Sequence, residues 1–208
     1  MSAAASLASL RAMGLPVVTT RDAALRLGQS ESATSHLLRR LADAGVVRKI
    51  CRGLWAIEPD VDVMAIVPAL TAPYPSYVSL WSALHAHGML SQIPRETHAV
   101  SLGRSRRIST PLGVVVVHQL APEVFGGFEV LPSGIALARP AKAVFDLAYL
   151  GATHGRRFRH LPELRLDDGY RGAEARAWVA RIRSARLRSM TLERVETIER
   201  QAALAAGS

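Results

Sequence analysis

The sequence predicts an α+β fold, with a small N-terminal unit of three helices and a β-hairpin, then a larger α+β part that ends in helices. Three observations lead to this prediction. Apolar residues recur at helical spacing in the first 45 residues, the β-branched run 114–117 indicates a buried strand, and helical spacing returns after residue 172. With 49% hydrophobic and 21% charged residues, the 208-residue chain can bury such a core. We expect two domains, 1–58 and 63–208, because Pro59 and the residues that follow it interrupt the pattern.

Three short helices are expected first, at about 6–13, 21–27 and 31–44. Each is followed by a glycine that can end it, namely Gly14, Gly28 and Gly45. Hydroxyl side chains precede the second and third helices and can cap them: Thr19 or Thr20, and Ser30 or Ser32. The second and third helices are therefore joined by a turn of only a few residues.

The third helix has two distinct faces. Its expected core stripe is Ala33, Leu37, Leu41 and Ala44, with Leu38 beside them. The opposite face carries Ser32, Ser35, His36, Arg39 and Asp43, with Thr34 and Arg40 at its margins. A helix with small polar residues and arginine on its outer face, joined to the preceding helix by a short turn, fits the major groove of DNA. Arginine there can pair with guanine or with phosphate.

A basic hairpin is expected next, with strands at 46–50 and 54–57 and a turn at Cys51, Arg52 and Gly53. Together with the three helices it predicts a winged helix-turn-helix. The basic side chains of the wing can contact the DNA backbone or the minor groove. The predicted DNA-binding residues are Ser32, Ser35, His36, Arg39, Arg40, Arg48, Lys49 and Arg52. The alternative for such a unit is a protein-interaction or purely structural module.

The charge distribution also indicates a polyanionic partner. Residues 1–57 hold eight Arg or Lys against three Asp or Glu, and residues 151–208 hold twelve against seven. The middle, 58–150, holds six against seven. The basic ends favour nucleic acid. A second basic block at 156–159 and 181–188 either meets nucleic acid or is a solvated helix face.

The C-terminal part is expected to be a small sheet with helices packed on it. Ser76 or Ser79 should cap a helix that continues to His87, and Pro140 should begin another. Strands are expected at 98–102, 114–117 and 128–131. Two more helices are expected at 172–189, with Trp178 facing inward, and at 191–201, with Thr191 as its cap.

Three stretches carry a resemblance to a known family. They are LRRLADAGVVRK with RGLW at 38–49 and 52–55, PSYVSLWSALHAHG at 75–88, and IALARPAKAVFDLAY at 135–149. Over about residues 7–200 the chain resembles the AbiEi family of antitoxins and transcriptional regulators from type IV toxin–antitoxin systems.

The resemblance implies an autorepressor whose winged helix binds operator repeats in duplex DNA. It also implies that the C-terminal domain counteracts a nucleotidyltransferase-like toxin, which is encoded by the partner gene, and that this domain helps repression. Because a lone winged helix makes few base contacts, we expect copies to dimerise or to load cooperatively on DNA. The alternative is a winged-helix regulator with a ligand-sensing C-terminal domain.

Catalysis, cofactors and metal ions are not expected. His85 and His87 lie about 200° apart on a helix and have no further ligand at suitable spacing. Asp146 is expected to make a structural pair with Arg139 or Lys142, and Glu163, Asp167 and Asp168 are expected to be loop charges. No run reaches the roughly 18 apolar residues of a membrane helix, and a single cysteine, Cys51, fits a reducing compartment, so we expect a cytoplasmic protein.

Overall fold

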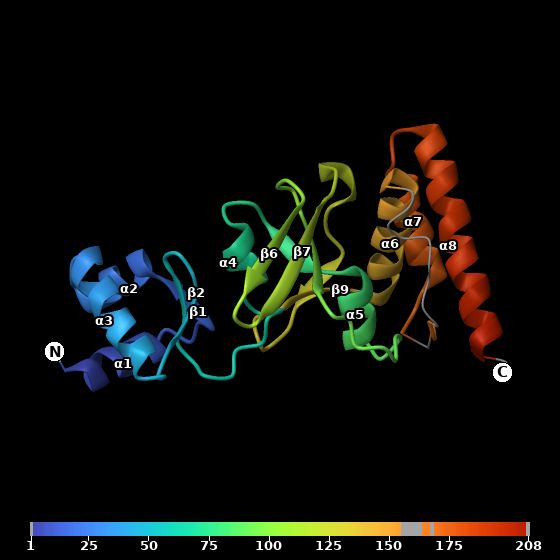
Figure 1. The fold of residues 1–208 in the computed structure, drawn as a ribbon. Coiled ribbons are helices and arrows are strands. Elements are labelled where there is room, and N and C mark those ends of the chain that lie inside the picture. Colours follow the sequence, from blue (N-terminus) through green and yellow to red (C-terminus); the bar gives the residue numbers. More distant parts are fainter. Residues whose placement is uncertain (1, 155–163, 167–168, 207–208) are drawn as a thin grey trace.

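The computed structural model describes residues 2–154, 164–166 and 169–206 (Figure 1). A three-stranded unit lies at one end of the molecule, a six-stranded sheet lies in the middle, and three helices lie at the other end (Figure 1). The predictions for 156–159 and for Glu163, Asp167 and Asp168 fall outside the described residues.

The N-terminal unit is a winged helix-turn-helix, as predicted. Its elements are α1 (Ala3–Arg11), β1 (Val17–Thr19), α2 (Thr20–Leu27), α3 (Glu31–Asp43), β2 (Arg48–Cys51) and β3 (Leu54–Ala56). The three strands form an antiparallel sheet in the order β1-β3-β2. Because β1 pairs with β3, the hairpin is fixed to the chain segment that enters α2.

Capping side chains set the ends of α2 and α3. The Thr19 hydroxyl oxygen accepts a hydrogen bond from the Asp22 amide at 3.0 Å, and the Ser30 hydroxyl oxygen accepts one from the Ala33 amide at 3.2 Å. Gly28 ends α2 with φ of 64°, a left-handed conformation that glycine adopts without steric cost. The reversal between the two helices therefore takes only three residues, 28–30.

The core stripe of α3 differs from the prediction. Its buried residues are Thr34, Leu38 and Leu41, whereas Ala33 and Ala44 are exposed. Both stripes have helical spacing, and small residues such as alanine and threonine do not distinguish them. The side on which α2 packs decides which stripe is buried. Leu38 and Leu41 join a core with residues of α1, α2, β1, β3 and the ends of the hairpin, namely Leu10, Val18, Ala23, Leu27, Val47, Trp55 and Ile57.

The C-terminal part is α+β, as predicted. Its strands are β4 (Ser76–Val78), β5 (Thr97–Ser101), β6 (Arg106–Thr110), β7 (Gly113–Gln119), β8 (Phe128–Val130) and β9 (Ala136–Ala138). Its helices are α4 (Val67–Thr71), α5 (Leu80–Ala86), the 3₁₀ turn η1 (Pro122–Val124), α6 (Pro140–His154), α7 (Gly172–Ala180) and α8 (Ala185–Ala206). The sheet order is β6-β7-β5-β4-β9-β8, with β4/β9 and β5/β7 parallel.

One predicted cap holds in position only, and one helix boundary was predicted wrongly. Ser76 lies in β4, and Ser79 is the residue directly before α5, as one of the two alternatives had it; its side chain makes no capping hydrogen bond, and its hydroxyl donates to Asp146 at 2.7 Å. Thr191 does not begin a helix; it is buried inside α8, where its hydroxyl donates to the Leu187 carbonyl at 2.7 Å. The break between the last two helices lies earlier in the chain, at 181–184.

A small apolar cluster joins the two parts of the chain. It contains Val17, Ile50, Leu54 and Ala56 of the three-stranded sheet together with Ile66, which directly precedes α4. Half-buried residues packed against it include Val61, Val63, Ala69, Leu70 and Leu112, the last of these in the β6–β7 turn. The sheet face opposite α3 is therefore covered by the C-terminal part. The division into domains 1–58 and 63–208 stays a prediction.

Candidate nucleic-acid interface

The polar face of α3 presents most of the predicted DNA-binding residues. Ser32, His36, Arg39 and Arg40 are exposed, and Ser35 is half-buried. The Arg39 guanidinium donates a hydrogen bond to the Ser35 hydroxyl at 3.4 Å, one helical turn away. This hydrogen bond is long, so it orients the Arg39 side chain along α3 without engaging all of its donors.

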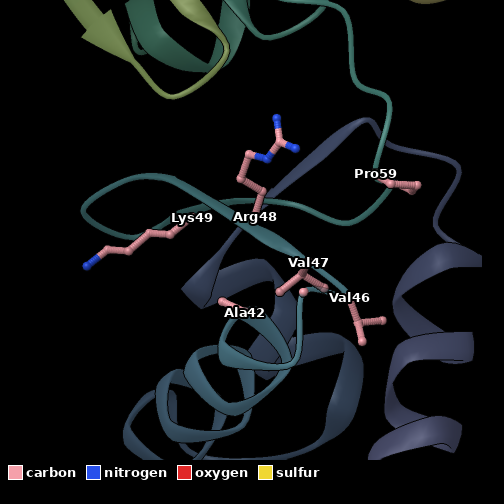
Figure 2. Close-up of a pocket in the computed structure, with 7 residues that line it drawn as sticks. Ala42, Val46, Val47, Arg48, Lys49 and Pro59 are labelled. Carbon is pink, nitrogen blue, oxygen red and sulfur yellow. The ribbon is translucent and has the colours of Figure 1, made fainter.

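The wing places its basic side chains in different directions. Arg48 pairs with Ala56 and Lys49 pairs with Trp55, so the two side chains lie on opposite faces of the sheet. Lys49 is on the side of α3, with its ammonium 5.8 Å from the centre of the Trp55 ring. Arg48 points away from α3, toward the C-terminal part (Figure 2).

The tip of the wing is a two-residue turn. Cys51 pairs with Leu54, which leaves only Arg52 and Gly53 between the strands. Gly53 has φ of 77°, as tight hairpin turns require, and the Arg52 side chain is exposed. The structure thus brings Ser32, Ser35, His36, Arg39 and Arg40 together on one helix face. It places Lys49 beside that helix and Arg52 at the wing tip.

A hollow of about 240 Å³ lies between the end of α3 and β2. It is lined by Ala42, Gly45, Val46, Val47, Arg48, Lys49 and Pro59 (Figure 2). The lining contains no carboxylate, and the charged ends of Arg48 and Lys49 leave it in different directions (Figure 2).

The basic residues of this interface are not neutralised within the described part of the chain. Among the described residues, Arg39, Arg40, Arg48, Lys49 and Arg52 form no ion pair, whereas Arg107 elsewhere is paired with Glu96 and Arg176 with Glu199. Unpaired, exposed cationic groups are free to neutralise phosphates.

Arg21 is a further candidate for this interface, and the sequence analysis did not name it. It is exposed in the first turn of α2, close to the cap Thr19. In helix-turn-helix proteins the helix before the recognition helix crosses the DNA backbone, so a cation at its N-terminus can contact phosphate. The signal that could have identified Arg21 was its position directly after the candidate caps Thr19 and Thr20.

The most polar buried cluster lies elsewhere, in the C-terminal part. The Lys142 ammonium pairs with the Asp146 carboxylate, which confirms Lys142 and not Arg139 as the partner. Asp146 also accepts hydrogen bonds from the Ser79 hydroxyl at 2.7 Å and the Tyr77 hydroxyl at 3.1 Å. Burial raises the pKa of Asp146, while Lys142 and the two hydroxyls oppose the rise, and burial lowers the pKa of Lys142.

This cluster is closed to solvent. All four side chains are at zero exposure, and the rings of Phe145 and Trp178 pack against the Lys142 ammonium with centres 4.6 and 4.7 Å away. A substrate has no access to these groups, and their hydrogen bonds join Asp146 of α6 to Tyr77 of β4 and to Ser79, which follows β4.

The two histidines at the end of α5 are held by backbone carbonyls. A ring nitrogen of His85 lies 2.9 Å from the Leu90 carbonyl oxygen, and one of His87 lies 2.8 Å from that of Ala138. Among the residues that the structure describes, no three His, Cys, Asp or Glu side chains are grouped so that they could hold a metal ion. None of the described helices is both long and apolar enough to span a bilayer.

Comparison with known proteins supports the N-terminal assignment. Residues 6–57 match the model of a family described as transcriptional regulator, AbiEi antitoxin. The match begins within α1 and extends past β3, so it covers the winged helix-turn-helix, and it confirms the resemblance predicted for this part of the chain. No curated protein matches the chain.

Proposed function

We propose that the protein is a sequence-specific DNA-binding repressor and the antitoxin of a type IV toxin–antitoxin operon. The observation that supports this most directly is the exposed face of α3, inside a winged helix-turn-helix that matches the AbiEi model. On that face Arg39 and Arg40 have no ion-pair partner among the described residues. In this proposal α3 enters the major groove of operator DNA.

Each predicted side chain has a role that follows from its place. Ser32, Ser35 and His36 lie in the N-terminal half of α3 and face base edges, and Arg39 reads a base, most favourably guanine. Arg40, Lys49 and Arg52 contact phosphates. Arg48, on the opposite face of the wing, reaches DNA only if the duplex bends around the hairpin.

The antitoxin role rests on the family description. In this role the chain is functionally paired with a nucleotidyltransferase-like toxin from the same operon, and it acts in the cytoplasm. Repression of that operon requires more contact than one α3 can supply, so two or more copies occupy operator repeats. Sedimentation with the full operator tests this point, and a complex with strictly one copy would contradict it.

Fluorescence anisotropy with the promoter region of the protein's own operon, and with a scrambled duplex of equal length, tests the assignment. Arg39→Ala should weaken operator binding by about 1–3 kcal/mol and reduce the preference over scrambled DNA. Arg52→Ala should weaken binding to both duplexes alike. Arg48→Ala is the matched control on the other wing face and should have the smallest effect. Wild-type protein that binds both duplexes equally would overturn the proposal.

A further inference from the structure

The face of the three-stranded sheet that points away from α3 is apolar, and the C-terminal part covers it. Val17, Ile50, Leu54 and Ala56 are all buried there. They form one cluster with Ile66, which has no exposed surface. Burial of this face therefore requires the C-terminal part, which holds the hairpin from the side opposite α3.

Two residues of this cluster flank the wing tip. Ile50 and Leu54 lie on either side of the turn that carries Arg52. The carbonyl oxygen of Gly53, in the same turn, accepts a hydrogen bond from the Thr20 amide at 2.9 Å. The backbone that carries the Arg52 side chain is thus held by the start of α2 and by the apolar cluster.

One contact with the cluster comes from the two-residue turn between β6 and β7, Pro111 and Leu112. The Leu112 side chain is half-buried and packs against the cluster. The Thr110 hydroxyl closes the turn, because its oxygen accepts from the Leu112 amide at 3.2 Å and its proton goes to the Gly113 carbonyl at 2.8 Å. Pro111 restricts its own φ. A rigid turn therefore presents Leu112 to the hairpin.

The same turn is joined to α4 and to the segment before it. The Arg106 guanidinium of β6 donates to the Leu70 carbonyl of α4 at 2.8 Å. Gly113 lies next to Val63, since a Cβ added at Gly113 would be 3.7 Å from the Val63 side chain. Val63 and Leu70 pack against the cluster as well. The turn, α4 and the preceding segment therefore form one continuous support under the hairpin.

We propose that Leu112 is a positioning residue for DNA binding, which acts through the wing. It holds Arg52 where the wing tip and α3 can reach the same duplex, and it does not touch DNA itself. A wing that is ordered before binding does not lose conformational entropy on binding, so its contact contributes more to affinity. This contribution of the C-terminal part needs no phosphate contact. The inference rests on the proposed function, which makes DNA the ligand of α3 and the wing.

The test uses three single variants of the full-length chain. Leu112→Ser removes the apolar contact, and Leu112→Met retains it. Leu131→Ser is the matched control, because Leu131 is a half-buried leucine between β8 and β9 that packs on the core of the C-terminal part. Circular dichroism and thermal unfolding establish that the variants keep the fold.

Hydrogen exchange followed by mass spectrometry reports on the wing without DNA. In Leu112→Ser the amides of residues 48–56 should exchange faster by about fivefold or more, because the hairpin opens locally more often. Leu112→Met and Leu131→Ser should keep the wild-type exchange in this segment. Unchanged exchange in Leu112→Ser, or equal changes in Leu112→Ser and Leu131→Ser, overturns the inference.

Fluorescence anisotropy with the promoter duplex measures the consequence for binding. Leu112→Ser should weaken binding and make the plot of log K against log salt shallower by about 0.9, the loss of one phosphate contact. Combined with Arg52→Ala it should add little further loss, because the two changes remove the same contact, whereas its loss and that of Arg39→Ala should add. Additive losses with Arg52→Ala overturn the inference. Failure of the proposed function has a different signature: wild-type protein would show no operator preference, while the difference in hydrogen exchange would remain.

Discussion

Replacement of Asp146 by asparagine tests how the C-terminal part is held together. Asp146 is fully buried on α6 and is the shared acceptor for Lys142, Ser79 and Tyr77. Asparagine keeps the volume and one acceptor oxygen but removes the negative charge. The Lys142 ammonium would then remain buried among aromatic rings without its carboxylate partner.

The expected cost follows from that unpaired charge. Breaking a buried ion pair by removing one partner typically costs about 3–5 kcal/mol. Of the two hydrogen bonds that Asp146 accepts from hydroxyl groups, the amide oxygen of asparagine can still accept one. The cost expected for Asp146→Asn therefore stays at about 3–5 kcal/mol, the cost of the broken ion pair. Lys142→Met should cost toward the lower end of this range, because Asp146 keeps both hydroxyl donors and can take up a proton. The double variant should cost less than the sum of the two.

Urea unfolding followed by circular dichroism measures these free energies of unfolding, and equal m-values verify that the comparison is valid. A double-mutant cycle then isolates the coupling between the two residues. A cost below about 1 kcal/mol for Asp146→Asn, or strict additivity in the double variant, would refute the reasoning that the pair stabilises this core.

Three further predictions concern single positions. Ser30→Ala removes the cap of α3 and should lower the free energy of unfolding by about 1 kcal/mol in urea, and no loss would contradict the capping role. Gly127→Ala should cost about 2–4 kcal/mol, because its φ is 72° and a Cβ would lie 2.6 Å from the Trp178 ring; Gly134→Ala, with a φ of 81° and open space, should cost clearly less. Burial lowers the pKa of His98 below its usual 6.5, against the opposing charge of Glu96, so the folded state loses stability as pH falls below about 6.5. His98→Asn should flatten the unfolding free energy between about pH 7 and 5, and an unchanged slope would contradict this.

The N-terminal unit was predictable because its signals are local. Caps, glycines and the hairpin turn lie within a few residues of the structure that they specify. Thr19, Ser30, Gly28 and Gly53 all act as expected or as one of two stated alternatives. Local signals do not show which side of a helix faces its neighbours, because the packing of other elements decides this. The burial of Thr34 in place of Ala33 is such a case.

The C-terminal part was predictable only in outline. The strands β4 and β9 have three residues each, too few for a periodic pattern, and they pair across about 60 residues of chain. Ser79 precedes a helix, as its neighbours indicate, but its hydroxyl donates to Asp146, 67 positions later, and its side chain makes no capping hydrogen bond. Contacts between residues far apart in the sequence cannot be read from the residues around either partner. The neighbours of Thr191 likewise do not indicate that α8 continues through it.

The position of the C-terminal part also limits how DNA can approach. Ile66 and Leu112 cover the sheet face that carries Val17 and Ala56, so that face of the wing is closed to a duplex that lies along α3. Lys49 lies on the other side of the sheet, with Trp55 and α3, and its side chain is exposed there. Arg48 shares the covered side of the sheet, and this explains why two adjacent basic residues with the same sequence signal should differ in their effect on DNA binding. The difference between Lys49 and Arg48 is therefore set by the packing of the C-terminal part against the wing.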